Sequence, residues 1–216
     1  MWKAWTEPSG QRFIRGPIAV YDTPVRFKKP GSDKHHVEIY RNGSFRGMID
    51  NIDDTELDVA MVFNHAAAFH NQVGFVDRPF LKTDMGVNGA LLGRLSAGTL
   101  RLDEENGAVY ATAALPDTSY AHDAYVLAER GDAPGGSFHM LESKTKKRSM
   151  DLPGGDILDI YDDVWLTEAT VTPFPIVPQT ANMRAFMSPS PTTDINEQAN
   201  LEIRIALMEM ELAAYA

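Results

Sequence analysis

The 216-residue sequence contains no cysteine, which excludes disulfides, thiolate catalysis and sulfur-ligated zinc. It has no apolar run long enough to span a bilayer. Its first eight residues also lack the apolar segment of a secretory signal. We therefore expect an intracellular protein with no membrane partner.

Basic residues are in the minority, since 20 Lys and Arg stand against 30 Asp and Glu and give a net charge of −10. A surface of this charge repels a polyanion, so we expect no nucleic-acid partner. The one basic run, 144–148, has no interleaved aromatic residue and is interpreted as a solvated loop.

Phosphate-binding and zinc-binding motifs are also missing. No Gly-Lys-Ser/Thr follows the glycines at 86, 89 and 93, and His65 and His70 lack the H-E-x-x-H spacing and an obvious third ligand. His35 and His36 are expected in a loop, and His122 on an exposed helix. We predict neither a cofactor nor a metal ion.

Short apolar runs broken by turn residues predict a β-rich α+β fold, either a barrel or a sandwich, without βαβ alternation. Strands are expected at 18–21, 57–63, 157–161 and 164–171, and a hairpin over 98–115 turns near Asn106-Gly107. Between them, 116–119 offers helix-capping residues, and Tyr120, Ala124 and Leu127 recur at helical spacing before Gly131.

We expect the chain to divide into three parts: a domain at 1–186, a Pro/Ser linker at 187–193 and an amphipathic helix at 194–216. Asp194 and Glu197 resemble an N-cap and its N3 partner. An apolar stripe follows, comprising Leu201, Ile205, Met208, Leu212 and Tyr215. The stripe predicts a partner, which is the chain's own domain, a second copy or another protein.

Three residues supply the parts of an activated serine nucleophile. Ser137 follows Gly135-Gly136, a pair that frees the backbone for a tight bend, and His65 ends the apolar face of Val59, Met61 and Phe63 in period two. Glu168 shares a strand face with Leu166 and Thr170. A neutral imidazole takes the hydroxyl proton and a carboxylate holds that imidazole.

Each member of this set has an ordinary structural alternative: a turn serine, a core histidine and a solvent-facing glutamate. The order His, Ser, Glu excludes an α/β-hydrolase, which needs Ser, acid, His and a G-x-S-x-G elbow. His139 is a rival imidazole, two residues along the extended chain from Ser137. Backbone N–H groups near Ser137 and Phe138 are expected oxyanion donors. Arg94 is interpreted as half of a barrel-surface ion pair, and the alternative is that it orients a water molecule or a nearby carboxylate.

An ordered series of short motifs resembles the prohead (capsid maturation) proteases of HK97-type tailed phages. Its upstream stretch, Glu38 to Phe45, fits an E-x-x-x-x-G-(A/S)-F pattern. The others lie at 63–65, 92–94, 98–102, 115–118, 130–132, 136–138 and 166–171. His139 departs from the glycine that is common in that family, Thr170 departs from serine, and the insert at 69–80 is longer than expected.

The resemblance implies a compact β-barrel flanked by helices, similar to the herpesvirus assemblin proteases. It implies a serine endopeptidase with His65 as base, Ser137 as nucleophile and Glu168 as third member. Its substrates would be the scaffolding protein or the scaffolding segment of the major capsid protein, and the enzyme itself, cut near 187–193.

These proteins would also be its partners inside the procapsid in the host cytoplasm, with a homo-oligomer as a further option. The main alternative function is a catalytically silent capsid assembly module with the same fold, and a hydrolase of small esters is a weaker one.

Overall fold

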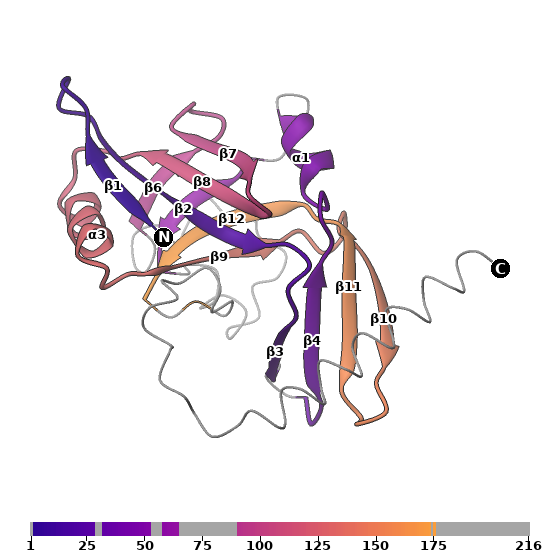
Figure 1. Cartoon of the computed structure of the whole chain (residues 1–216). Coiled ribbons are helices and arrows are strands. Elements are labelled where there is room, and N and C mark those ends of the chain that lie inside the picture. Colours follow the sequence, from indigo (N-terminus) through magenta and orange to yellow (C-terminus); the bar gives the residue numbers. More distant parts are fainter. Residues whose placement is uncertain (1, 29–31, 53–57, 65–89, 174, 176–216) are drawn as a thin grey trace.

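The computed structural model describes residues 2–28, 32–52, 58–64, 90–173 and 175. Twelve strands and two helices lie in these ranges (Figure 1). In chain order they are β1 (Lys3–Thr6), β2 (Arg12–Val20), β3 (Val25–Lys28), β4 (His35–Tyr40), α1 (Arg46–Asp50), β5 (Ala60–Phe63), β6 (Ala90–Arg94), β7 (Leu100–Glu105), β8 (Ala108–Ala114), α3 (Ser119–Arg130), β9 (Gly135–Met140), β10 (Lys146–Asp151), β11 (Ile157–Asp163) and β12 (Leu166–Thr172).

The strands form three four-stranded sheets, with orders β1-β2-β8-β7, β6-β5-β12-β9 and β10-β11-β4-β3. Pairings are antiparallel except β11 with β4 and β12 with β5. The first two sheets enclose the main core, and they meet where β9 packs on β2 and where β6 packs on β7 and β8. Among the described residues neither sheet closes on itself, and an assemblin-like barrel stays a prediction.

The third sheet stands beside the other two (Figure 1). One of its faces carries a separate apolar cluster of Val37, Ile39, Leu152, Leu158 and Ile160. Its other face contributes Tyr40 and Tyr161 to the main core. The third sheet therefore packs directly against the part of the fold that contains β9 and β12. Neither α1 nor α3 is long and apolar enough to cross a membrane.

Local sequence signals place the hairpin and the longer helix correctly. Asn106 and Gly107 take positive φ values of 51° and 76° between β7 and β8, as a two-residue turn requires. Thr118 caps α3 by accepting a hydrogen bond from Ala121 N–H, and Gly131 ends it in the left-handed region. Of the residues predicted at helical spacing, Ala124 is buried and Leu127 is partly buried against the main core, whereas Tyr120 is 38% exposed. The buried residues of the helix are Ala121, Ala124 and Ala128.

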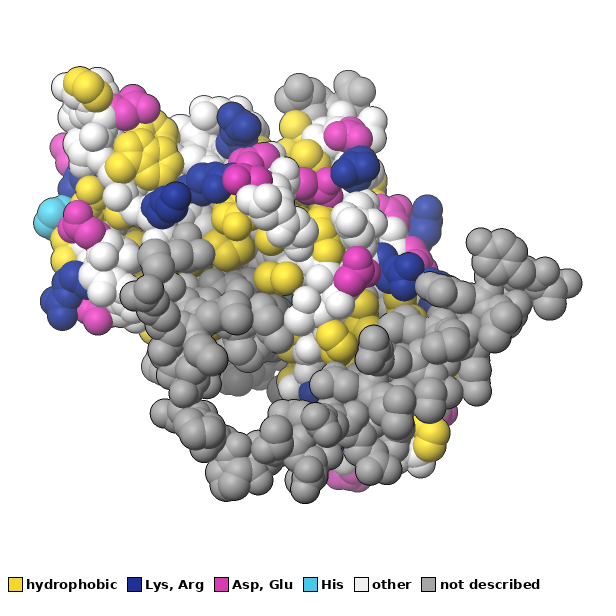
Figure 2. All heavy atoms as spheres, viewed as in Figure 1, with side chains coloured by type: hydrophobic (Ala, Val, Ile, Leu, Met, Phe, Trp, Pro, Cys, Tyr) yellow, Lys and Arg dark blue, Asp and Glu magenta, His cyan; other side chains and the backbone are white. Residues whose placement is uncertain are grey.

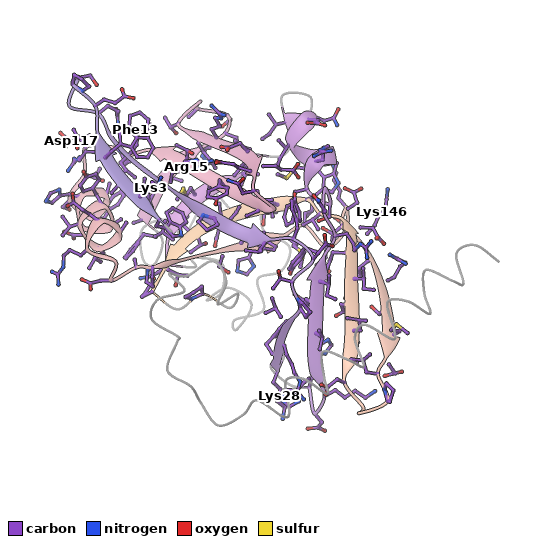
Figure 3. The ribbon with its side chains drawn as sticks, viewed as in Figure 1. Lys3, Phe13, Arg15, Lys28, Asp117 and Lys146 are labelled. Atoms are coloured by element: carbon purple, nitrogen blue, oxygen red, sulfur yellow. The ribbon has the colours of Figure 1, made fainter. Side chains whose placement is uncertain are left out.

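Two segments that were predicted as loops, the basic run at 144–148 and the pair at 35–36, enter strands instead. The basic run enters β10, an edge strand paired with β11, and its cations face acidic residues: Lys146 lies 3.4 Å from Asp163, and Arg148 binds Asp162 at 2.6 Å. Figure 3 shows Lys146 projecting outward from this strand. His35 and His36 belong to β4, because pairing with β3 and β11 stabilises an extended chain that the sequence pattern did not reveal. Basic and acidic side chains are interspersed over the described surface in Figure 2.

Candidate active site

Ser137 lies inside strand β9 and is 4% exposed. The predicted tight bend is wrong, because Gly135 and Gly136 belong to the same extended strand and neither has a positive φ. Close packing explains both glycines. A Cβ on Gly136 would lie 2.1 Å from the Pro17 carbonyl oxygen, and one on Gly135 would lie 2.2 Å from Pro175 Cγ. Only glycine allows this strand to approach its neighbours so closely.

Beside β9, one face of β12 carries buried polar side chains. Glu168 and Thr170 are fully inaccessible to solvent and Thr172 is 4% exposed. The opposite face carries Ala169 and Val171, which belong to the main core. Buried polar side chains are more informative than buried apolar ones, because removing them from water costs free energy unless they find partners. This polar face is therefore the strongest candidate for a site.

The strand register brings the nucleophile candidate onto that face. Ser137 pairs directly with Thr170, and His139 pairs with Glu168. Residues opposite each other in a ladder point to the same side, so Ser137, Thr170 and Glu168 share one face, as the alternation of β12 predicted for Glu168 and Thr170. Leu166 was wrongly assigned to it: an irregularity before Glu168 pairs Leu166 with Met140 and turns it to the core side.

Thr170 is the site residue that sequence reasoning did not assign. Its hydroxyl Oγ1 donates a hydrogen bond to Glu168 Oε1 at 2.5 Å, and both side chains are buried. A donor at this distance stabilises the ionised carboxylate and restricts its rotation. The signal was present in the sequence, because Thr170 lies two residues from Glu168 on a predicted strand.

His65 lies outside the described residues, so the structure does not test its predicted role. The preceding residue, Asn64, has a φ of 58°, which ends the strand alternation after Phe63. Asn64 N–H donates to Val171 O at 2.9 Å, and Val171 pairs with Gly136 on its other side. The end of β5 therefore lies level with the residue before Ser137, one strand away.

His139 is the described histidine nearest to this site by register. It projects from β9 on the same face as Ser137 and stands opposite Glu168, where paired Cβ atoms are about 4.5–5.5 Å apart. Its backbone carbonyl accepts a hydrogen bond from Thr167 Oγ1 at 3.4 Å. By its register position, His139 remains the rival imidazole to His65.

Arg94 takes no part in this arrangement. Its Nη1 lies 2.5 Å from Asp58 Oδ2, and Ser96 donates to the same carboxylate from its backbone N–H and its hydroxyl. Partial burial raises the pKa of Asp58, but the hydrogen bonds from Arg94 and Ser96, with the charge of Arg94, outweigh it and lower the pKa overall. The predicted ion pair is present, but it is partly buried rather than on the surface, since only 14% of the Arg94 side chain is exposed.

No group of three or more His, Asp or Glu side chains in the described ranges is arranged to hold a metal ion. The arrangement that the structure does provide is a hydroxyl, a second hydroxyl and a buried carboxylate along two adjacent strands. Chemically, such a set is suited to orienting a base and stabilising its protonated form beside a serine.

Comparison with known proteins gives one result. Searches of curated proteins and of solved structures found no significant match. Residues 87–190 match the model of a family described as caudovirus prohead serine protease. The matched segment contains Ser137, Glu168 and Thr170 and begins after His65. This match supports a relationship between the matched segment and the phage prohead serine proteases.

Proposed function

We propose that this chain is the endopeptidase that matures a phage procapsid from inside, in the host cytoplasm. It cleaves scaffolding protein, or the scaffolding segment of the major capsid protein, and it cleaves itself. The observation that carries the proposal is the buried polar face shared by Ser137, Thr170 and Glu168, which lies within the segment that matches the prohead protease family.

In the proposed reaction, the Ser137 oxygen attacks the carbonyl carbon of the scissile peptide bond while its proton moves to His65. The tetrahedral intermediate collapses, the C–N bond breaks, and the protonated His65 gives its proton to the leaving amine. A water molecule then attacks the acyl-enzyme with His65 again as base, releasing the acid and restoring the Ser137 hydroxyl. Water is the second substrate, and no electron acceptor is required.

Glu168 supplies the negative charge that stabilises the imidazolium during both halves of the reaction. Thr170 holds the Glu168 carboxylate in one orientation, because its 2.5 Å hydrogen bond restricts rotation of the carboxylate. Backbone N–H groups near Ser137 and Phe138 are proposed to bind the oxyanion, where one well-aimed donor contributes about 3 kcal/mol of barrier lowering.

The decisive experiment is co-expression of the chain with the capsid and scaffolding proteins of its own phage, followed by intact-mass analysis. Wild type is compared with Ser137→Ala and with Ser143→Ala, an exposed turn serine that serves as the matched control. Cleavage in wild type and Ser143→Ala, but not in Ser137→Ala, supports the protease. Assembly without cleavage from any version supports the silent assembly module instead.

Self-cleavage is proposed to fall in the linker at 187–193, which lies outside the described residues, as does the helix predicted at 194–216. We propose that this tail tethers the enzyme to scaffold or capsid protein. Deleting residues 188–216 is then expected to lower incorporation into procapsids, measured by quantitative mass spectrometry of purified particles. Unchanged incorporation would remove the tether from the proposal.

A further inference from the structure

Glu38 is a buried carboxylate that binds two phenols. Its Oε2 accepts a hydrogen bond from Tyr40 OH at 2.7 Å, and its Oε1 accepts one from Tyr161 OH at 3.0 Å. Burial, followed by the nearby Glu38 carboxylate, raises the pKa of both phenols, so they remain protonated and act as donors. The two oxygens of Glu38 therefore fix two tyrosine rings on neighbouring strands, β4 and β11.

One of those rings contacts β9, the strand that contains Ser137. The rings of Tyr40 and Tyr161 stack, with centroids 4.9 Å apart and planes 22° apart. The Tyr40 ring meets Phe138 edge-on at 5.2 Å, and Phe45 meets Phe138 edge-on at 5.4 Å. Phe138 is thus held between two aromatic rings, in the edge-to-face geometry that such pairs prefer.

Phe138 follows Ser137 and points to the other side of β9, so the two side chains share a short piece of backbone. That backbone belongs to the edge strand of its described sheet, where β9 pairs with β12, and β9 also packs on β2. The ring contacts of Tyr40 and Phe45 with Phe138 supply a further support, from outside the sheet that contains β9. Movement of the Phe138 ring would tilt the strand and displace the Ser137 hydroxyl.

We propose that Glu38 is a positioning residue for Ser137, acting through Tyr40 and Phe138. This inference rests on the proposed function, since it concerns how the nucleophile is presented. It also gives a physical role to the stretch from Glu38 to Phe45. The carboxylate and Phe45 stand at its two ends, and Gly43 turns the chain between them with a φ of 81°.

The test measures inactivation of the full-length protein by a fluorophosphonate, with the labelled residue identified by mass spectrometry. Wild type is compared with Glu38→Gln, Tyr40→Phe and Tyr161→Phe, which change hydrogen bonding with little change of volume. We expect the maximal rate of Ser137 labelling to fall about tenfold or more in Glu38→Gln and Tyr40→Phe, because small displacements of a nucleophile are costly. The fluorophosphonate concentration that gives the half-maximal labelling rate should stay near the wild-type value.

Tyr21→Phe is the matched control. Tyr21 also donates its phenol O–H to a glutamate, Glu104, and packs against Phe45 at 5.9 Å, but it has no ring contact with Phe138 among the described aromatic pairs. Its labelling rate is expected to match wild type. The double variant Glu38→Gln/Tyr40→Phe should be no slower than the slower single variant, because both changes act through the same contact.

The outcomes distinguish a failure of the positioning role of Glu38 from a failure of the proposed protease function. If wild type is not labelled at Ser137, the proposed protease function fails. If wild type is labelled but Glu38→Gln and Tyr40→Phe react within twofold of it, Glu38 does not position Ser137. An equal loss in Tyr21→Phe also overturns the inference, because it would reflect general loosening of the core. Should Glu38→Gln fail to fold, Tyr40→Phe and Tyr161→Phe decide the question.

Discussion

Thr170 and Glu168 form a buried hydroxyl–carboxylate pair with an Oγ1 to Oε1 distance of 2.5 Å, and Thr170 stands directly across the sheet from Ser137. Their hydrogen bond joins positions 168 and 170 of β12, so the carboxylate is linked to the residue that pairs with Ser137. Both residues are fully buried, so little water competes for their hydrogen bond.

Replacing Thr170 with valine preserves its shape but removes the donor. A hydrogen bond to a charged group contributes about 1.5–3 kcal/mol, so we expect Thr170→Val to slow Ser137 labelling by about tenfold or more. Thr170→Ser keeps the hydroxyl and should recover most of that rate. Fluorophosphonate labelling of the three proteins checks this, and equal rates for the valine and serine variants would contradict it.

The identity of the base is tested by comparing His65→Ala with His139→Ala. General-base catalysis contributes typically about 10²–10⁴-fold, so the proposed mechanism predicts a loss of this size in the His65 variant. The His139 variant should cleave scaffold at close to the wild-type rate. The reverse result would assign the base to His139, whose register position opposite Glu168 makes it the competing imidazole.

Gly136→Ala should destabilise the fold, because the new Cβ would lie 2.1 Å from the Pro17 carbonyl oxygen. We expect a loss of about 1–3 kcal/mol in the free energy of unfolding, measured by urea titration. Gly47→Ala is the control, since its Cβ would meet only Asp163 Oδ1, at 3.3 Å. A Gly136→Ala variant as stable as wild type would contradict the role of Gly136 in close packing against Pro17.

The Asp58–Arg94 pair predicts a pH-dependent contribution to stability. The folded pKa of Asp58 is lowered, so its contribution is complete above the unfolded value of about 3.9 and is lost as pH falls through the folded pKa. Asp58→Asn should therefore be less stable than wild type at pH 7, and the gap should narrow below about pH 4. Urea unfolding of the two proteins at pH 7 and below about pH 4 measures this difference in the free energy of unfolding.

The control for that experiment is Asp162→Asn, which breaks a more exposed pair with Arg148. Exposed pairs contribute about 0–1 kcal/mol, so this variant should differ little from wild type at either pH. A gap for Asp58→Asn that stays constant from pH 7 to pH 3 would show that the ionised form of Asp58 is not what stabilises the fold.

Sequence alone identified the features whose causes are local. Asn106 and Gly107 form a two-residue turn because they tolerate positive φ, and Thr118 and Gly131 bound α3 because they satisfy its terminal backbone groups. Alternation along β12 placed Glu168 and Thr170 on one face, and one hydrogen bond now joins them. These interactions connect residues within a few positions of each other.

Tertiary structure decided the features that depend on distant neighbours. The glycines before Ser137 serve close packing against Pro17 and Pro175, which no local pattern reveals, and the run at 144–148 enters a strand because β11 supplies partners. Leu166 left its predicted face through an irregularity opposite β9. Glu38, about a hundred residues before Ser137, is linked to β9 because it accepts a hydrogen bond from Tyr40, whose ring contacts Phe138. Such contacts arise only when the sheets assemble.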